Sequence, residues 1–209
     1  MKQSVLFFAM TVITFSLQAQ TEKTYTEAFD SVFINISRAD ATTGILYERV
    51  VPFANLLNYN SRVSASIDTS NYSHFIQAYS ELYRAAFNPS ARLPWTLERF
   101  EEEIVNGTTP GIVDIGILHY NFNVMDSVVG KQKLIKVNGV LVENPAITAS
   151  LYLYKTAFVA SPLSAAVDGT SGITFRLKND FYFSNTNTYL TQLLVDFDDG
   201  QGLRAVSIY

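Results

Sequence analysis

The 209-residue chain contains no cysteine. Disulfide frameworks, thiolate metal sites, thiol nucleophiles and the lipid-bearing cysteine of bacterial lipoproteins all require this residue, so each is excluded. Histidine is nearly as scarce. The two histidines, His74 and His119, lack the paired spacing of a histidine metal site. We therefore expect structural roles for both, with His74 facing solvent in the first turn of a helix and His119 on a strand face.

Charged residues make up only 16% of the chain, and the formal net charge is −4. Hydrophobic residues make up 48%, a balance typical of a folded chain and opposite to that of disorder. The densest run of charge, Glu98–Glu103, is acidic, whereas nucleic-acid binding needs a basic patch. We expect no nucleic-acid partner. After the first twenty residues no apolar run is long enough to span a bilayer, so no transmembrane segment is predicted.

Catalytic signatures are missing as well. The chain has no GxSxG nucleophile elbow, no P-loop and no dinucleotide fingerprint. The segment DGTSGI, Asp168–Ile173, comes nearest to an elbow but has a different spacing, and we predict a loop there. The glutamates within Glu98–Glu103 are predicted to form the solvated face of an amphipathic helix. The sequence therefore names no catalytic residue and no resident cofactor.

Residues 1–19 differ from the rest of the chain. Lys2 supplies a positive start, Val5–Leu17 is an apolar run, and small Ala19 follows in the sequence QAQ. This order is that of a secretory signal peptide. We expect cleavage near Ala19, which removes Lys2 and changes the net charge from −4 to −5. The mature protein is then secreted or held at the outer surface, with the periplasm as the other destination.

Residues 20–107 carry mainly helical patterns, because their apolar residues recur at helical spacing. Helices are predicted over 26–37, 71–88 and 95–107, and a short one from Pro52 that carries Phe53, Leu56 and Leu57. The predicted caps and stops are Thr26, Ser70 or Asn71, Pro89 and Gly107. The helix over 71–88 has the clearest apolar stripe, made of Phe75, Ile76, Tyr79, Leu82, Tyr83 and Ala86.

Beyond Pro110 the apolar period changes to two, which is typical of strands. Strands are predicted over 111–124, 151–160, 172–178, 190–197 and 203–209. Within 133–144, two apolar runs flank Asn138 and Gly139, a pair that favours a type I′ hairpin turn. Several short strands at this spacing favour an antiparallel sandwich or a partial barrel.

Asp196, Asp198 and Asp199 crowd into four positions and are followed by two glycines. An EF-hand loop that starts at Asp196 needs glycine at its sixth position and glutamate at its twelfth, where this chain has Gln201 and Ser207. Turn residues that tolerate positive φ explain the segment better. We predict a hairpin turn, with calcium binding by the three aspartates as the other interpretation.

The chain is rich in aromatic residues, with 12 tyrosines and 15 phenylalanines. Tyr152 and Tyr154 are predicted to alternate on one strand face, and Tyr182 lies between two phenylalanines. Such stripes serve as sugar-stacking platforms in some proteins, but packing across a sheet is the commoner role. We therefore expect mainly packing, with glycan binding kept as the other interpretation.

Two resemblances are visible. The segment VDFDDG resembles the WDFGDG turn of PKD-type β-sandwich modules of secreted proteins, with Val195 in place of the tryptophan and Asp198 in place of the glycine. The order of a leader ending in QAQ, the segment TGILYERVVPFANLLNYN (43–60) and a strand-rich region is similar to the N-terminal part of large secreted or surface proteins of Bacteroidetes-type bacteria. That resemblance implies that PKD-like modules, hydrolase domains or a type IX sorting tail follow. It carries over no catalytic residue.

These patterns predict an α+β protein with a signal peptide at 1–19, a helical region at 20–107 and an antiparallel β-sandwich-like region at 108–209. An apolar strand ending at Tyr209 leads us to expect further sequence or a partner strand. We interpret the protein as a secreted or cell-surface non-catalytic module that supports downstream domains or binds a protein or glycan. The alternative is a secreted hydrolase or the accessory region of one.

Overall fold

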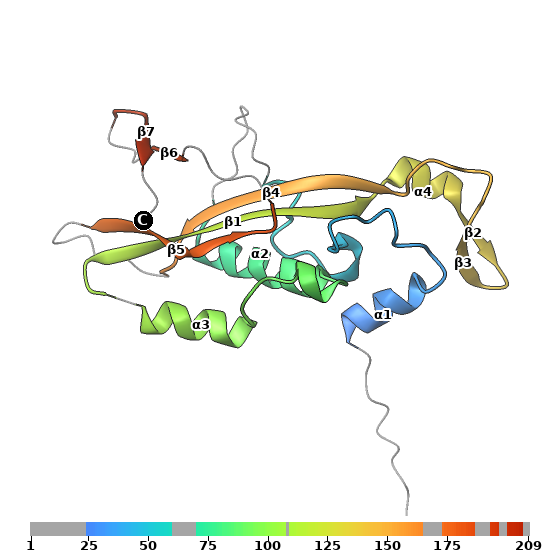
Figure 1. Cartoon of the computed structure of the whole chain (residues 1–209), viewed down its shortest axis with the longest axis horizontal. Helices are drawn as coiled ribbons and strands as arrows, with labels where there is room; N and C mark the ends of the chain where they lie inside the picture. Colours follow the sequence, from blue (N-terminus) through green and yellow to red (C-terminus); the bar gives the residue numbers. More distant parts are fainter. Residues whose placement is uncertain are drawn as a thin grey trace, which may run out of the picture.

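The computed structural model describes residues 24–59, 70–107, 109–164, 173–186, 193–196 and 200–206. The predicted signal peptide, as well as Asp198 and Asp199, lies outside the described residues. Helices dominate the first half of the described chain and strands the second half (Figure 1). The α+β class is therefore confirmed.

A three-stranded sheet with the order β4–β1–β5 runs along the length of the molecule (Figure 1). The central strand is β1 (Ile112–Met125), with β4 (Tyr152–Pro162) antiparallel to it and β5 (Thr174–Ser184) parallel to it. The predicted antiparallel arrangement was therefore wrong for β5. The alternation within a strand reports which side chains share a face but not the direction of its neighbour, which the intervening connection decides. The other described strands form two hairpins, so a full sandwich stays a prediction.

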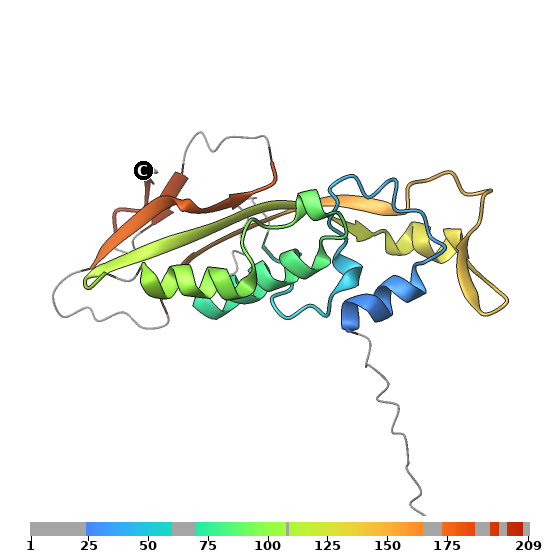
Figure 2. The same ribbon diagram turned by 60° about the horizontal axis from the view of Figure 1, so that its bottom comes forward.

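Helix α2 (Tyr72–Ala85) crosses one face of the sheet beside α3 (Leu97–Asn106) (Figure 2). It begins where predicted, because the Asn71 side chain accepts the main-chain N–H of His74 at 2.9 Å. It ends at Ala85, four residues before the predicted stop at Pro89, which instead opens the 3₁₀ helix η2 (Pro89–Ala91). Most of the predicted stripe is confirmed as core: Phe75, Tyr79, Leu82 and Ala86 are buried.

Helix α3 follows the predicted pattern closely. Thr96 caps its first turn by accepting the Arg99 N–H at 3.2 Å, and Gly107 is its C-cap. Phe100 is buried, and its ring stacks on that of Tyr79 of α2 with centroids 4.3 Å apart. Phe183 of β5 meets the Phe100 ring edge-on at 5.6 Å. The two helices and the sheet therefore share one core, in which aromatic rings from the different layers contact one another.

Gly116 lets α2 approach the middle of β1. A Cβ atom at this position would lie 2.7 Å from the Phe75 ring and 2.7 Å from the Leu163 side chain. No real side chain tolerates such contacts without moving its neighbours. The glycine in the predicted strand over 111–124 therefore marks the place where a helix side chain lies against bare backbone.

The first helix, α1 (Tyr25–Val32), is shorter than predicted and has a different cap. Thr24, not Thr26, is the N-cap: its hydroxyl accepts the Glu27 N–H at 3.3 Å, and the Glu27 carboxylate accepts the Thr24 N–H at 2.8 Å. This capping box satisfies two main-chain donors at once. None of the helix residues is buried. Ile36, predicted on the same helical stripe, lies beyond the helix and is buried in a second, smaller core cluster.

The segment 43–59 holds a short 3₁₀ helix, η1 (Tyr47–Arg49), and the predicted helix at Pro52 was wrong. Phe53 is 72% exposed, whereas Leu56 is fully buried. The carboxylate of Glu81 in α2 accepts the main-chain N–H groups of Phe53 and Ala54. The backbone conformation here is set by hydrogen bonds to Glu81, a residue distant in sequence that no local pattern reveals.

A lobe at one end of the molecule contains α4 (Ser127–Lys133) and the hairpin of β2 (Leu134–Val137) and β3 (Val140–Glu143) (Figure 1). The predicted hairpin is confirmed. Its two loop residues, Asn138 and Gly139, have φ values of 50° and 85°. Positive φ at both central residues is the requirement of a type I′ turn.

Helix α4 was not predicted, because valine and glycine are weak helix formers. Asp126 starts it by accepting the N–H groups of Val128 at 2.8 Å and Val129 at 3.2 Å. At its end, the Lys133 ammonium donates to the Ala149 carbonyl at 2.8 Å. The ammonium also lies 3.2 Å from the Glu143 carboxylate. Capping and the tertiary bonds of Lys133 therefore stabilise a helix that propensity alone does not favour.

Candidate functional site

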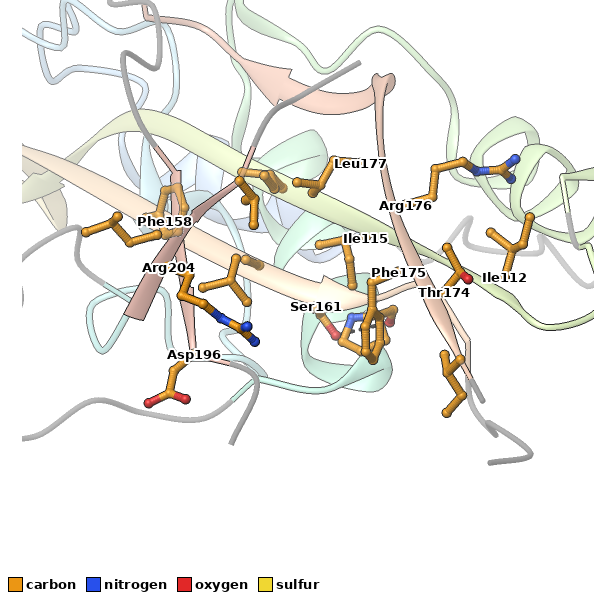
Figure 3. A pocket seen from close by; sticks show the side chains of 17 residues that line it. Ile112, Ile115, Phe158, Ser161, Thr174, Phe175, Arg176, Leu177, Asp196 and Arg204 are labelled. Atoms are coloured by element: carbon orange, nitrogen blue, oxygen red, sulfur yellow. Dashed lines mark hydrogen bonds between the residues drawn. The ribbon is translucent and has the colours of Figure 1, made fainter. Parts of the chain in front are cut away.

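An apolar groove lies between the β4–β1–β5 sheet and a hairpin of β6 (Leu193–Asp196) and β7 (Leu203–Val206) (Figure 3). Its volume is about 1150 Å³. The apolar lining side chains come from every strand of the sheet and from the hairpin: Ile112, Ile115, Ile117, Phe158, Ala160, Pro162, Ile173, Phe175, Leu177, Leu194, Val195 and Val206. Polar residues are the minority of the lining.

The alternation of β1 explains why the groove is apolar. Leu118 and Tyr120 point into the core shared with the helices, whereas Ile115 and Ile117 line the groove on the opposite face. Both faces of this stretch are therefore apolar, a pattern typical of strands that are covered on both sides. Ile117 is only 2% exposed, so part of the groove floor is well shielded from water.

The β6–β7 hairpin confirms the predicted strand pair at 190–197 and 203–209 over its described part, with Asp196 opposite Leu203. Gly200 and Gly202 have φ values of 79° and 70°, the positive values that we predicted for the turn. Asp196 is exposed at the end of β6. Among the described residues, no group of three or more histidine, cysteine or acidic side chains lies close enough to hold a metal ion.

Arg176 is a polar residue of the lining, and its charge is matched by Asp114. Its guanidinium makes two bonds to the Asp114 carboxylate, at 2.5 and 2.9 Å, and the Lys178 ammonium lies 3.0 Å from the same carboxylate. Burial acts to raise the pKa of Asp114, but the bonds from Arg176 and Lys178 outweigh it and hold the pKa below its usual value. Figure 3 shows the Arg176 side chain pointing away from the centre of the groove.

His119 lies on a strand face, as predicted, on the outer side of β1. Its ring meets that of Phe158 edge-on at 5.9 Å, and its Nδ1 is 3.5 Å from the Tyr182 hydroxyl. Burial lowers the pKa of His119. A histidine ring in contact with two aromatic side chains suits packing on this face of the sheet.

His74 is half-buried, which differs from the predicted solvent-facing position. Its ring lies against Tyr59, with centroids 6.3 Å apart. Its Nδ1 is buried and has no hydrogen-bond partner within the described part of the chain. The tertiary position of Tyr59, which sequence spacing does not reveal, accounts for the difference.

Buried charged groups are the polar features that the sequence analysis did not assign. Glu48 and Glu81 each accept main-chain N–H bonds through one carboxylate oxygen, while the other oxygen is buried without a partner in the described chain. Burial raises the pKa of both carboxyl groups. For Glu48, a signal of burial was present in the sequence, because the charged pair Glu48-Arg49 lies inside an apolar run. These groups bind backbone and hold segments together, and they do not converge on the groove.

The aromatic residues divide between packing and exposure. Tyr152 is buried and donates its hydroxyl to the Ser37 carbonyl at 3.0 Å, whereas Tyr154, two residues on, is 57% exposed. Tyr182 contacts His119, while Phe181 and Phe183 on either side of it enter the core. Packing is therefore the role of Tyr152, Phe181 and Phe183, whereas Tyr154, like Tyr25 and Phe53, is exposed.

No protein-family model, no curated protein and no solved structure matches this chain. Within the described ranges, no helix has both the length and the apolar character needed to cross a membrane. The site must therefore be interpreted from its own geometry.

Proposed function

We propose that this chain is a non-catalytic binding module of the cell exterior, secreted or held at the outer surface, that takes an elongated apolar small molecule in the groove between the sheet and the β6–β7 hairpin. The observation that carries the proposal is the size and lining of the groove. Ligand pockets are mostly apolar, with a few polar groups, and measure about 300–1000 Å³. The volume of this groove, about 1150 Å³, lies just above that range.

The lining favours an apolar ligand over a glycan. Sugars need aromatic faces flanked by several hydrogen-bonding groups. Among the described residues, the aromatic lining residues are Phe158 and Phe175, and Ser161 donates its hydroxyl to the neighbouring Pro162 carbonyl. Transfer of apolar surface out of water is then the main source of binding free energy, at about 25 cal/mol per Å² buried.

The setting of the module follows from the leader and from the resemblances of the sequence. In this proposal, the signal at 1–19 exports the chain, and the β6–β7 hairpin forms the second layer of a sandwich-like half. The module then supports or presents downstream domains of the same polypeptide. The exposed Leu194 of the hairpin and Phe175 of β5, which are 46% and 47% exposed, keep the groove accessible to a ligand from solvent.

A fluorescent fatty acid tests the groove. We expect the purified protein to bind dansyl-labelled undecanoic acid saturably with one site per chain, as followed by fluorescence titration. Phe175→Ser should weaken binding roughly tenfold, because the lost ring contact corresponds to about 1.4 kcal/mol. The matched control is Phe53→Ser, since Phe53 is 72% exposed and does not line the groove.

Three results would contradict the proposal: no saturable binding, equal weakening by both serine variants, or displacement of the probe by soluble glycans but not by unlabelled fatty acids. Circular dichroism of each variant confirms that its fold is retained.

A further inference from the structure

The outer edge of β4 presents main-chain groups in a regular order. In an antiparallel pair, rows in which the two strands bond to each other alternate with rows in which both point their main-chain groups away. On β1, the N–H of Asn123 donates to the Ile45 carbonyl at 2.9 Å, away from β4. Its register partner is Tyr154. The N–H and C=O of Tyr154 therefore point outward from the sheet.

The same holds two residues further along. The N–H of Asn121 donates to the Asn185 side chain at 2.7 Å, and the Asn185 amide donates to the Asn121 carbonyl at 2.8 Å. Both bonds lie on the side of β1 opposite β4. The register partner of Asn121 is Thr156, so the main-chain groups of Thr156 also point outward.

The protein itself uses the next two outward positions. The Phe158 N–H donates to the Tyr59 carbonyl at 3.0 Å, and the Ala160 carbonyl accepts the Ser70 hydroxyl. In the described chain, no partner takes up the outward main-chain groups of Tyr154 and Thr156. Every second residue of this stretch of β4 thus directs its main-chain groups outward. These groups are bonded at Phe158 and Ala160 and open at Tyr154 and Thr156.

The side chains beside the open positions are also exposed. Leu153 and Tyr154 are 40% and 57% exposed, and Lys155 is exposed between Tyr154 and Thr156. In Figure 1 this part of β4 forms the upper border of the sheet between the β4 label and α4. An open edge with exposed apolar side chains is a template for a further strand.

We propose that the edge of β4 from Leu153 to Ala157 binds an extended segment of a partner protein, which pairs with the main chain of Tyr154 and Thr156 and places an acidic side chain opposite Lys155. Two bonding residues offer two donors and two acceptors to the segment. Lys155 lies in the intervening row, where opposed side chains are closest. Lys155 therefore favours a partner segment that has an acidic residue directly opposite it.

Lys155 also argues against a second copy of this chain as the occupant. If two β4 edges paired antiparallel around this point, Tyr154 of each copy would pair with Thr156 of the other. The two Lys155 side chains would then face each other in the close row. Like charges directly opposite each other destabilise a strand pair. This surface is separate from the groove, so the inference does not depend on the proposed function.

Two labelled peptides test the proposal with the full protein. Both are seven residues long and rich in β-branched residues, and they differ only at the centre, which is glutamate in one and lysine in the other. We expect the glutamate peptide to bind about five times more tightly, as measured by fluorescence anisotropy. The reason is that glutamate places an opposite charge across from Lys155, whereas lysine places a like charge there. Lys155→Glu should reverse the preference, whereas Lys136→Glu, an exposed lysine of strand β2, should leave it unchanged.

A second variant tests the main-chain bonds. Tyr154→Pro removes an outward N–H, and proline is tolerated where the N–H faces outward on an edge strand. We expect this variant to keep its circular dichroism spectrum and to lose binding of both peptides. Equal affinity of the two peptides, an unchanged preference in Lys155→Glu, or dimerisation that Lys155→Ala strengthens in sedimentation would overturn the proposal.

Discussion

Arg49 and Asp30 form a two-armed ion pair, with Nε–Oδ1 and Nη2–Oδ2 separations of 2.9 Å each. The third nitrogen of the guanidinium donates to the carbonyls of Arg84 and Ala85 at the end of α2. One side chain therefore ties α1 to α2 and satisfies carbonyls that a helix end leaves unpaired. Hydrogen bonds from Arg49 hold the pKa of Asp30 below its usual value.

We predict that Arg49→Met lowers the free energy of unfolding by about 3 kcal/mol, because it removes both bonds to Asp30 and the bonds to the Arg84 and Ala85 carbonyls. Asp30 then keeps its bond from Arg38, and the Ala85 carbonyl keeps the Leu46 N–H. Urea unfolding followed by circular dichroism measures the loss. The control is Arg99→Met, which removes an exposed pair with Glu103 and should cost less than about 1 kcal/mol. Equal losses in the two variants would contradict a special role for Arg49.

Leu82 is fully buried at the centre of α2. We predict that Leu82→Ala lowers the free energy of unfolding by about 2–5 kcal/mol, through lost apolar burial and the cavity left behind. Leu57→Ala is the matched control, because Leu57 is 45% exposed and its loss should cost less than about 0.5 kcal/mol. A loss at Leu82 as small as that at Leu57 would show that this helix face is not the core.

The stability of the protein should depend on pH through Glu81. Burial raises the pKa of Glu81 above its usual value of 4.5, so the folded state binds the proton more tightly than the unfolded chain. This contribution is fully present below pH 4.5 and is lost as the pH rises through the folded-state pKa. We predict that Glu81→Gln, which keeps an oxygen for the Ala54 N–H, flattens the decline in stability as the pH rises above 4.5.

Asp114 serves as a control, because its pKa is shifted in the opposite direction to that of Glu81. Its pKa is held below the usual value of 3.8, so its contribution is present above that pH and is lost as the pH falls through the folded-state pKa. Asp114→Asn should therefore alter the acid side of the stability profile and leave the neutral side unchanged. A neutral side that is as steep in Glu81→Gln as in the original protein would rule out Glu81 as its origin.

The acidic hairpin should not require calcium. Gly200 and Gly202 adopt the positive φ values of a turn, which supports the turn interpretation of this segment. We expect the same melting temperature in millimolar calcium and in EDTA, measured by differential scanning fluorimetry. A rise in calcium that disappears in both Asp198→Ala and Asp199→Ala would establish a calcium site instead.

Export is a separate prediction. In a Gram-negative host, the chain expressed with its leader should lose its N-terminus near Ala19, because Lys2 and Val5–Leu17 have the order of a signal peptide. Mass spectrometry of the periplasmic and extracellular fractions measures the mass of the mature chain. Phe8→Arg places a charge in the apolar run and should leave the protein uncleaved. Cytoplasmic material with an intact Met1 in the original protein would refute export.

Part of the groove was visible in the sequence. The strands that line it were predicted from their alternation, and the β6–β7 turn from its glycines, because these signals act within a few residues. What the sequence did not reveal was that Ile117, Phe175 and Leu194 would line the same groove. Which strands line it together depends on the connections between strands, and alternation does not report which strands become neighbours.

The elements with local signals could be predicted from the amino-acid sequence alone. The cap at Asn71 with its apolar stripe defines α2, and the Asn138–Gly139 pair defines a hairpin, because a cap and a type I′ turn each depend on neighbouring residues. The backbone path at Phe53 and the direction of β5, by contrast, depend on contacts that are made in the folded protein. Glu81 holds the first by hydrogen bonds across 28 residues of sequence, and the second sets Asp114 beside Arg176, 62 residues away. Contacts over such separations exist only once the chain has folded.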